Sequence, residues 1–298
     1  MKIKFQKKSV TLVATLMMTS LWNCNIMASE LENCQSLGRS TAQHWMARTS
    51  LPLIDTTLTM AQAECARTEF LKQLQPLLGP PVGYKVAAVT PPAQRDLGVR
   101  DPLSATYLAG MFRMLDSDSD VVIPLNYASR PIVEAKLMVT VKDDGINLAK
   151  TVDDVAEHIA YVVPSIELGD SLVRPDQKLT GPILTVYNVG TRAVLNGPAI
   201  QFNSTEELKK SLRGMIVTTR DGDGKIIETE PGSSIMGDPL KAVLWIIHDQ
   251  NSRGVMLHAG DKLGLGAMSR VRPKKGTVMD TEWKGLGEKS VTLQVRFK

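Results

Sequence analysis

The sequence RPIVEAKLMVTV, residues 130–141, and the sequence YVVPSIELGDS, residues 161–171, carry the pattern that decides the fold. The first alternates as a strand does and holds Glu134 and Lys136 two residues apart, so both side chains leave the same face. The second is an apolar run that contains Glu167 and Asp170. Charges inside apolar strands are costly to bury unless they find partners, so these two segments indicate a polar site built on two strands.

The composition and the order of the elements indicate the fold class. The chain has 298 residues, 43% of them hydrophobic, which is enough for one large domain or two modest ones. Helix-like segments come first, and mostly strands with two interspersed helices follow. This order predicts an α+β protein with a substantial mixed or antiparallel sheet.

The N-terminus has the pattern of a secretory signal. Four lysines lie among the first eight residues, an apolar run covers residues 10–22, and Ala28 provides a small residue at a cleavage point. We therefore expect residues 1–28 to be a signal peptide and the protein to be periplasmic or secreted. The alternatives are an uncleaved amphipathic anchor and a lipoprotein at Cys24. No other run is long enough to span a bilayer, so we expect no membrane contact after cleavage.

Loss of the signal changes the charge balance. Residues 1–28 hold four lysines and no acids, so the remaining chain would have 31 basic and 31 acidic residues. A net charge near zero gives no electrostatic basis for nucleic-acid binding, which we do not expect.

Two cysteines remain in the mature chain, Cys34 and Cys65. In an exported protein, a lone pair of cysteines is typical of a disulfide rather than of a catalytic or metal site. The alternative is two free thiols too far apart to join.

The first part of the mature chain is predicted to be helical. Residues 30–49 have helical character softened at Gly38, and a second helix over residues 57–78 ends at Gly79-Pro80-Pro81. The predicted organisation is a signal peptide (1–28), an N-terminal helical region (29–80) and a catalytic-type domain (81–298).

The strand-like run over residues 82–89 has Lys85 in its middle. This lysine could extend its amine to the surface or be held inside against acids, and the pattern alone does not decide between the two.

Local signals mark three further elements. Thr151 is a candidate N-cap for a helix over residues 152–160, and Asp238 for a helix with Pro239 at its first position. The segment Asp221-Gly222-Asp223-Gly224 predicts a hairpin, because the glutamate that a calcium loop needs downstream is missing.

Several ordered motifs carry a family resemblance that spans residues 50–298. They are GYKV (83–86), LGV (97–99), RPIVEA (130–135), YVVPSIELGDS (161–171), GDPLKAVLW (237–245) and AGD (259–261). Together they resemble the fumarylacetoacetate hydrolase superfamily, on the branch of 2-keto-4-pentenoate hydratases and 4-oxalocrotonate decarboxylases. The resemblance implies an α+β fold with a mixed β-sheet roll or barrel core and an N-terminal helical part. It also implies a homo-oligomer.

The resemblance also implies a reaction and a cofactor. Members hold Mg²⁺ or Mn²⁺ on three carboxylates, and the metal grips the carboxylate and 2-oxo groups of a small 2-oxo acid. The matching positions here are Glu134, Lys136 and Glu167. Lys85 would assist proton transfer between the dienol and the ketone. We further expect Glu134 and Glu167, together with Asn188 at a strand end, to contact the substrate.

Lys136 departs from the family pattern, because an ammonium has no acceptor and cannot ligate a cation. Ala267 also stands where the family has a small hydroxyl residue. Three alternatives follow. Lys136 could replace the metal and polarise the 2-oxo group, the protein could have lost catalysis and bind a small acid or serve a structural role, or Glu134 and Glu167 could still hold a metal. The expected function is therefore an exported, hydratase-like lyase with Lys85 and Lys136 as catalytic residues, and the alternative is an inactive family member.

Overall fold

The computed structural model describes residues 31–115 and 121–298 of the 298-residue chain. The predicted signal peptide, residues 1–28, lies outside the described residues. Among those that are described, no helix has both the length and the apolar character needed to cross a membrane.

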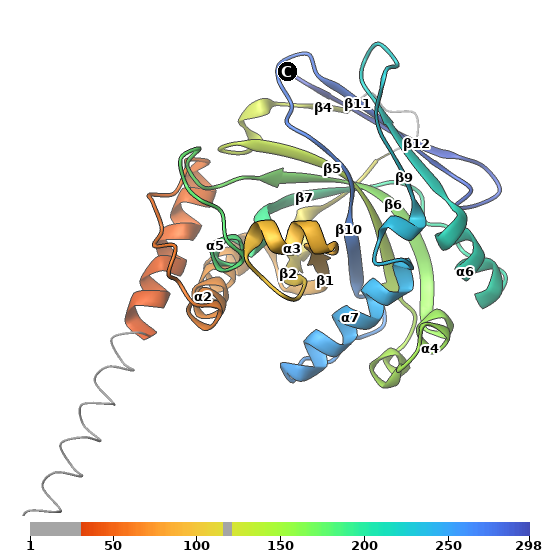
Figure 1. The fold of residues 1–298 in the computed structure, drawn as a ribbon, viewed down its shortest axis with the longest axis horizontal. Helices are drawn as coiled ribbons and strands as arrows, with labels where there is room; N and C mark the ends of the chain where they lie inside the picture. The colour runs from red at the N-terminus through yellow and green to blue at the C-terminus, as the bar shows by residue number, and fades with distance from the viewer. Residues whose placement is uncertain (1–30, 116–120) are drawn as a thin grey trace, which may run out of the picture.

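The helices gather at the N-terminus and around a large sheet (Figure 1). They are an N-terminal helix (31–47), α2 (Met60–Leu78), α3 (Pro91–Leu97), α4 (Val152–Glu157), α5 (Gly181–Val186), α6 (Thr205–Gly214) and α7 (Pro239–Ser252). Short 3-10 turns are η1 (Ala109–Met111), η2 (Leu125–Tyr127), η3 (Asp144–Leu148), η4 (Asn188–Gly190) and η5 (Gly232–Ser234).

The strands form two sheets. The larger has seven strands in the order β2-β1-β10-β5-β6-β7-β3, and the smaller has five in the order β4-β12-β11-β8-β9. Their bounds are β1 (Pro81–Ala87), β2 (Leu103–Leu108), β3 (Phe112–Met114), β4 (Val121–Ile123), β5 (Pro131–Val141), β6 (Ile159–Asp170), β7 (Thr191–Asn196), β8 (Ile216–Arg220), β9 (Ile226–Pro231), β10 (Lys262–Val271), β11 (Val278–Lys284) and β12 (Val291–Phe297). Most neighbours are antiparallel, while β1 pairs with β10, β3 with β7 and β4 with β12 in parallel.

One face of the large sheet is apolar and the other carries the polar site, as the alternation in β5 predicts. Ala135, Leu137 and Val139 enter the main hydrophobic core, whereas Glu134 and Lys136 leave the opposite face. The core side packs against the second sheet and against α4, α6 and α7. The site side is continued by a smaller apolar cluster that involves α2 and the N-terminal helix. The polar site itself lies between this face of the sheet and the helices α3 and α5, which line the same cavity.

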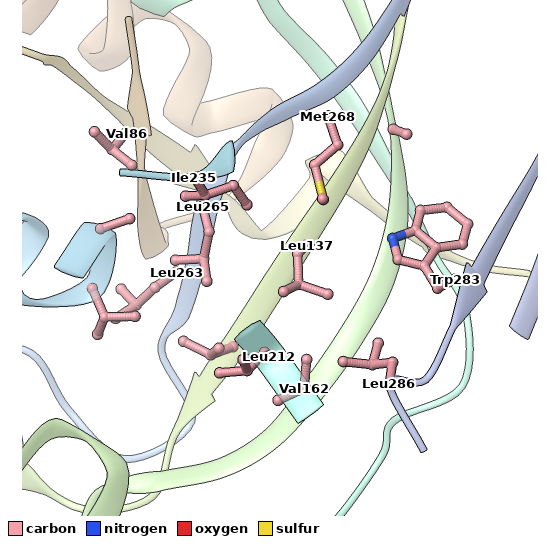
Figure 2. Packing of buried hydrophobic residues seen from close by; sticks show 14 of the residues in the cluster. Val86, Leu137, Val162, Leu212, Ile235, Leu263, Leu265, Met268, Trp283 and Leu286 are labelled. Atoms are coloured by element: carbon pink, nitrogen blue, oxygen red, sulfur yellow. The ribbon is translucent and has the colours of Figure 1, made fainter. Parts of the chain in front are cut away.

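The main core is filled by large aliphatic side chains and one tryptophan. Figure 2 shows Leu137 of β5, Val162 of β6, Leu212 of α6 and Met268 of β10 pointing toward the interior, with Trp283 of β11 at one side. All five are at most 2% exposed. Each such side chain stabilises the fold by about 1.5–3 kcal/mol through burial, which fixes the curvature of the sheet that carries the site.

The N-terminal helices are joined as the sequence indicated. Cys34 and Cys65 form a disulfide with Cα atoms 5.8 Å apart. The prediction that the first helix is softened at Gly38 is wrong, because the helix is continuous over residues 31–47. A Cβ at Gly38 would overlap the carbonyl oxygen of Ala66 in α2. The glycine thus allows two helices to approach closely rather than interrupting one.

Local signals placed other elements well. Thr151 caps α4 and Asp238 caps α7 with Pro239 first, as predicted. α4 ends at Glu157 rather than at residue 160, because β6 already begins at Ile159. The α+β class with a mixed sheet and N-terminal helices is confirmed.

Candidate active site

Strand register brings together the polar residues of β5 and β6. Glu134 lies directly opposite Glu167 in the antiparallel pair, and Lys136 lies opposite Ser165. On the other side of β5, Glu134 faces Arg270 of β10. Beyond β10, β1 supplies Lys85. Four strands therefore deliver charged side chains to one face of the sheet.

Lys136 lies between the two glutamates. Its Nζ is 3.1 Å from Glu134 Oε2 and 3.6 Å from Glu167 Oε2, and its side chain is 3% exposed. The other oxygen of Glu134 accepts a 2.6 Å hydrogen bond from Nε of Arg270. Both carboxylates thus have a cation within reach, which makes the burial of these acids tolerable.

Lys85 is held inside against an acid rather than reaching the surface. It is 1% exposed, and its Nζ donates to Glu167 Oε1 at 2.6 Å and to the Val189 carbonyl at 3.2 Å. Glu167 also accepts hydrogen bonds from the hydroxyls of Tyr107, at 3.3 Å, and Thr191, at 3.2 Å. Glu167 is therefore the centre of the buried network.

The Val189 carbonyl is offered to Lys85 by a strained turn. Asn188, Val189 and Gly190 have φ angles of 55°, 53° and 75°. A positive φ is rare for a β-branched residue because it strains the backbone. Residues with such strained backbones are found mostly at functional sites. The turn therefore aims a backbone oxygen at a buried amine.

Asn188 does not lie where a substrate contact was expected. It is fully buried, its Oδ1 accepts from the Thr106 N–H at 2.9 Å, and its Nδ2 donates to the Thr106 carbonyl at 2.8 Å. Its side chain thus ties η4 to β2 and does not line the cavity described below. We assign Asn188 to supporting the Val189 turn and not to the ligand.

Burial disfavours the charged form of both lysines, but their neighbours differ. In Lys136, the Glu134 and Glu167 carboxylates outweigh burial and raise the pKa. In Lys85, burial and the nearby Lys136 charge outweigh the attraction of Glu167 and lower the pKa. Lys136 is therefore the more permanent cation of the two.

A cavity of about 340 Å³ opens onto this cluster. Lys85, Lys136, Glu134 and Glu167 line it from the sheet, and Tyr187, Arg270 and Arg272 line it elsewhere. Three cations (Lys85, Lys136 and Arg270) face the two glutamates, so the cluster has one positive charge in excess.

The sequence pattern does not predict several of the residues that surround the cavity. Tyr107 and Thr191 contact Glu167 from β2 and β7, and nothing in the local pattern singles them out. Arg270 and Arg272 carried a usable signal, because they are two residues apart where β10 ends, and extended chain places residues with this spacing on one face. Asp170, by contrast, is bound by Arg192 at 2.6 Å and by the backbone N–H of Arg130 at 2.9 Å. Asp170 therefore holds the turn at Arg130 in place.

The residues present do not fit the divalent ion that the resemblance implies. Mg²⁺ and Mn²⁺ need several oxygen ligands, and Lys136 presents three donors at the position of one of them. The remaining carboxylates, Glu134 and Glu167, face ammonium and guanidinium groups. Over residues 31–115 and 121–298, no group of three or more His, Cys, Asp or Glu side chains could hold a metal.

Comparison with known proteins identifies the family. No family model matches the chain. The 2-keto-4-pentenoate hydratase of Paraburkholderia xenovorans (strain LB400) is 27% identical over 208 residues, covering 69% of this chain and 73% of the hydratase. The 4-oxalocrotonate decarboxylase of Pseudomonas putida G7, complexed with magnesium and adipate, superposes with a TM-score of 0.77 at 19% identity and covers 90% of this chain and 98% of that one.

A more distant solved structure has the same fold. The fumarylpyruvate hydrolase of Pseudomonas aeruginosa, in complex with Mn²⁺ and pyruvate, gives a TM-score of 0.51 at 16% identity over 72% of this chain and 88% of that one. The resemblance to the fumarylacetoacetate hydrolase superfamily, on the branch of 2-keto-4-pentenoate hydratases and 4-oxalocrotonate decarboxylases, is confirmed.

Proposed function

We propose that this protein acts on a small 2-oxo acid through its enol, with the Lys136 ammonium in place of a divalent metal ion. One observation carries the proposal: Nζ of Lys136 lies 3.1 Å from Glu134 and 3.6 Å from Glu167, between the family's two remaining carboxylates. The family membership supports the reaction class, and the solved relatives bind small acids, adipate and pyruvate.

The first role of the site is to bind the acid. The excess positive charge of the cluster favours an anion, and a substrate carboxylate would neutralise it among largely buried side chains. The Lys136 ammonium then donates to the 2-oxo oxygen, where negative charge develops as the enol forms. A single charge polarises this oxygen less than a divalent ion would, so we expect slower chemistry than a metal-dependent relative shows.

The second role is proton transfer at the carbon next to the 2-oxo group. Lys85 and Glu167 are joined by a 2.6 Å hydrogen bond and both line the cavity. The pKa of Lys85 is lowered while that of Lys136 is raised, so the two lysines suit different tasks. We assign Lys85 to moving the proton and Lys136 to holding the oxygen.

Proton exchange tests this proposal without assuming a final product. The purified protein is incubated in D₂O with pyruvate or 2-oxopentanoate and a chelator, and loss of the C3 proton signal is followed by NMR. We expect exchange above the buffer rate and a loss of roughly 10²-fold or more in Lys85→Ala. Lys225→Ala, which removes an exposed lysine between β8 and β9, serves as the matched control. Exchange no faster than buffer across several 2-oxo acids would refute the enol chemistry.

Binding without turnover is the second candidate function. The observation in its favour is that Glu167 already accepts hydrogen bonds from Lys85, Tyr107 and Thr191, so donors of the chain already occupy its oxygens. This candidate predicts a thermal shift with pyruvate or oxalate and no proton exchange. A flat thermal-shift screen with measurable exchange would reject it.

We also propose that the protein works outside the cytoplasm. The support is the N-terminal pattern of basic residues, apolar run and small residue, together with the Cys34–Cys65 disulfide, which is typical of oxidising compartments. A fusion of residues 1–28 to a reporter that is active only after export should be active. A reporter retained in the cytoplasm would contradict the proposal. The expected homo-oligomer remains a prediction.

A further inference from the structure

We infer that the protein has a second binding site, separate from the candidate active site, and that this site takes an uncharged carbohydrate. The site is a cavity of about 610 Å³ at the ends of β5 and β6 that lie away from Glu134 and Glu167. Among the described residues, none lines both this cavity and the active-site cavity. Thr140 of the new cavity and Glu134 are six residues apart in β5, so about 20 Å of strand separates them. The inference is therefore independent of the proposed function.

A β-bulge opens this end of the sheet. Thr140 pairs with Tyr161, but Val141 pairs with Ile159, so Ala160 is an extra residue in β6. An extra residue bends its strand and interrupts the ladder of hydrogen bonds between the two strands. The hollow therefore begins where β5 and β6 part.

Helices and a loop close the cavity around the bulge. Figure 1 shows α4 at this end of β5 and β6, and α6 packs against α4. The loop is residues 197–204, which join β7 to α6. Ile200 of the loop and Val162 of β6 exchange two hydrogen bonds, at 2.8 and 2.9 Å, which fix the loop on the sheet. The walls are thus preformed, and a ligand need not order them on binding.

The cavity offers apolar surface, including two aromatic rings. Val141, Ala156 and Leu208 line it and are at most 3% exposed. Phe202 lines it while packing against the main core, and Tyr161 lines it with 42% of its surface exposed. A sugar ring has a face of C–H groups, and its contact with such side chains removes apolar surface of both from water.

The polar side chains of the cavity are mostly uncharged. They include two amides, Gln201 and Asn203, and the hydroxyls of Thr140 and Thr205. In the described part of the chain, no hydrogen bond engages the two side-chain amides or the Tyr161 hydroxyl. An amide both donates and accepts, as sugar hydroxyls do, so these groups can exchange water for the hydroxyls of a carbohydrate.

The charges of the cavity offset each other. Among the described residues that line it, the charged ones are Lys142 and Glu157, one of each sign. The Lys142 ammonium also donates to the Glu157 carbonyl oxygen at 3.4 Å. An ionic ligand would lose hydration here without meeting a net opposite charge, which favours an uncharged one. The volume falls within the range of about 300–1,000 Å³ for small-molecule sites and leaves room for a short oligosaccharide.

Calorimetric titration of the purified protein tests the site. The uncharged probes are maltotriose, cellotriose and triacetylchitotriose, and the charged probe is trigalacturonate, which carries a carboxylate on each ring. An uncharged peptide, N-acetyl-trialanine amide, is the third kind of probe. We expect at least one uncharged trisaccharide to bind with a Kd of about 1 mM or tighter, and about ten-fold or more tightly than trigalacturonate and the peptide.

Two variants locate the bound sugar. Tyr161→Ala should weaken binding by about ten-fold or more, whereas Tyr161→Phe keeps the ring and should weaken it by less than about three-fold. Gln201→Ala should weaken it several-fold. Gln294→Ala, which removes an exposed glutamine on β12, is the matched control and should leave binding unchanged. Because Tyr161 and Gln201 are exposed, the variants should keep the wild-type Tm, which thermal unfolding checks.

The outcomes decide between a carbohydrate and other ligands. No binding of any trisaccharide up to about 10 mM would overturn the inference. Equal affinity for trigalacturonate or for the peptide would also overturn it, because the cavity would then not select an uncharged carbohydrate. Saccharide binding that survives unchanged in both Tyr161→Ala and Gln201→Ala would place the sugar elsewhere on the protein.

Discussion

The chemistry that we assign to the site depends on Lys136. It occupies a strand position whose neighbours, Glu134 and Glu167, would be metal ligands in the family, and its Nζ reaches both of them. An ammonium at that point supplies positive charge through the chain itself. Under the proposed function, a lysine at this position also takes the place of an oxygen ligand, so one residue would change both the electrostatics and the donor set.

Replacing that residue with the family's acid should restore a metal site. We expect Lys136→Glu to bind Mn²⁺, because Glu134 and Glu167 already lie within 4 Å of the side chain that is replaced. Saturating Mn²⁺ at about 100 times its Kd would stabilise the variant by about 2.7 kcal/mol, which thermal unfolding can measure. Lys136→Gln is the control and should not respond. If Lys136→Glu fails to bind Mn²⁺, the two glutamates are not the family's ligand positions.

Glu134 should make the free energy of unfolding depend on pH in the acidic range. Burial alone would raise its pKa, but the charges of Lys136 and then Arg270 lower it below the unfolded value of 4.5. The contribution of ionised Glu134 to the free energy of unfolding is therefore complete above pH 4.5. It is lost as the pH falls through the pKa that Glu134 has in the folded protein.

We expect Glu134→Gln to lose about 3 kcal/mol of unfolding free energy at pH 7, because it breaks a buried pair. The difference from wild type should shrink steadily between pH 4.5 and about pH 3. Urea unfolding at each pH checks this. A constant difference over that range would mean that Glu134 is not held ionised by its neighbours.

At the scale of elements, the site depends on the close approach of β1, β2 and β10. Gly264 of β10 faces Lys85, and a Cβ there would lie 3.1 Å from Lys85 Cβ and overlap the Tyr107 hydroxyl. The glycine thus leaves room for the tyrosine that hydrogen-bonds Glu167. Gly264 therefore contributes to the site although it has no side chain.

Gly264→Ala should displace Tyr107 and lower the unfolding free energy by about 1–3 kcal/mol, the usual cost of overpacking. It should also weaken ligand binding, because Glu167 loses a donor. The control is Gly214→Ala at the end of α6, where a Cβ meets no atom within 4 Å. Equal effects from the two substitutions would show that the crowding at Gly264 is unimportant.

The disulfide acts between two helices. It links residues 31 positions apart, and the chain-entropy model gives about 3 kcal/mol of stabilisation for such a loop. We expect the Cys34→Ser/Cys65→Ser double variant to have a Tm lower by roughly 5–10 °C. A reducing agent should lower the Tm of wild type by a similar amount and leave the variant unchanged. A wild-type Tm insensitive to reduction would contradict this role.

For the whole molecule, the proposed function predicts independence from metal. The cation of the site is covalently part of the chain, so dialysis against EDTA should change neither the Tm nor the rate of proton exchange. Relatives with three carboxylates are the natural comparison, since a bound ion stabilises the folded state. A Tm that falls on chelation and recovers with Mn²⁺ would show that a metal contributes after all.

Much of this architecture could be predicted from local sequence. The caps at Thr151 and Asp238 follow from backbone hydrogen bonding that neighbouring residues satisfy. The position of the Lys85 amine cannot be predicted locally, because a lysine in an apolar strand is compatible with either a surface or an interior amine. The role of Gly38 cannot be predicted locally either, since only the partner helix reveals that its missing side chain serves packing.

The sequence by itself determined the main strands, the helix caps at Thr151 and Asp238 and the shared face of Glu134 and Lys136, because these depend on a period of two and on nearby residues. Only the tertiary structure decided that Lys85 and the two arginines meet that face. They arrive because β10 pairs with β1 in parallel and with β5 in antiparallel fashion. Such pairings join segments far apart in the chain, and their partners are selected by packing of the whole core rather than by any local pattern.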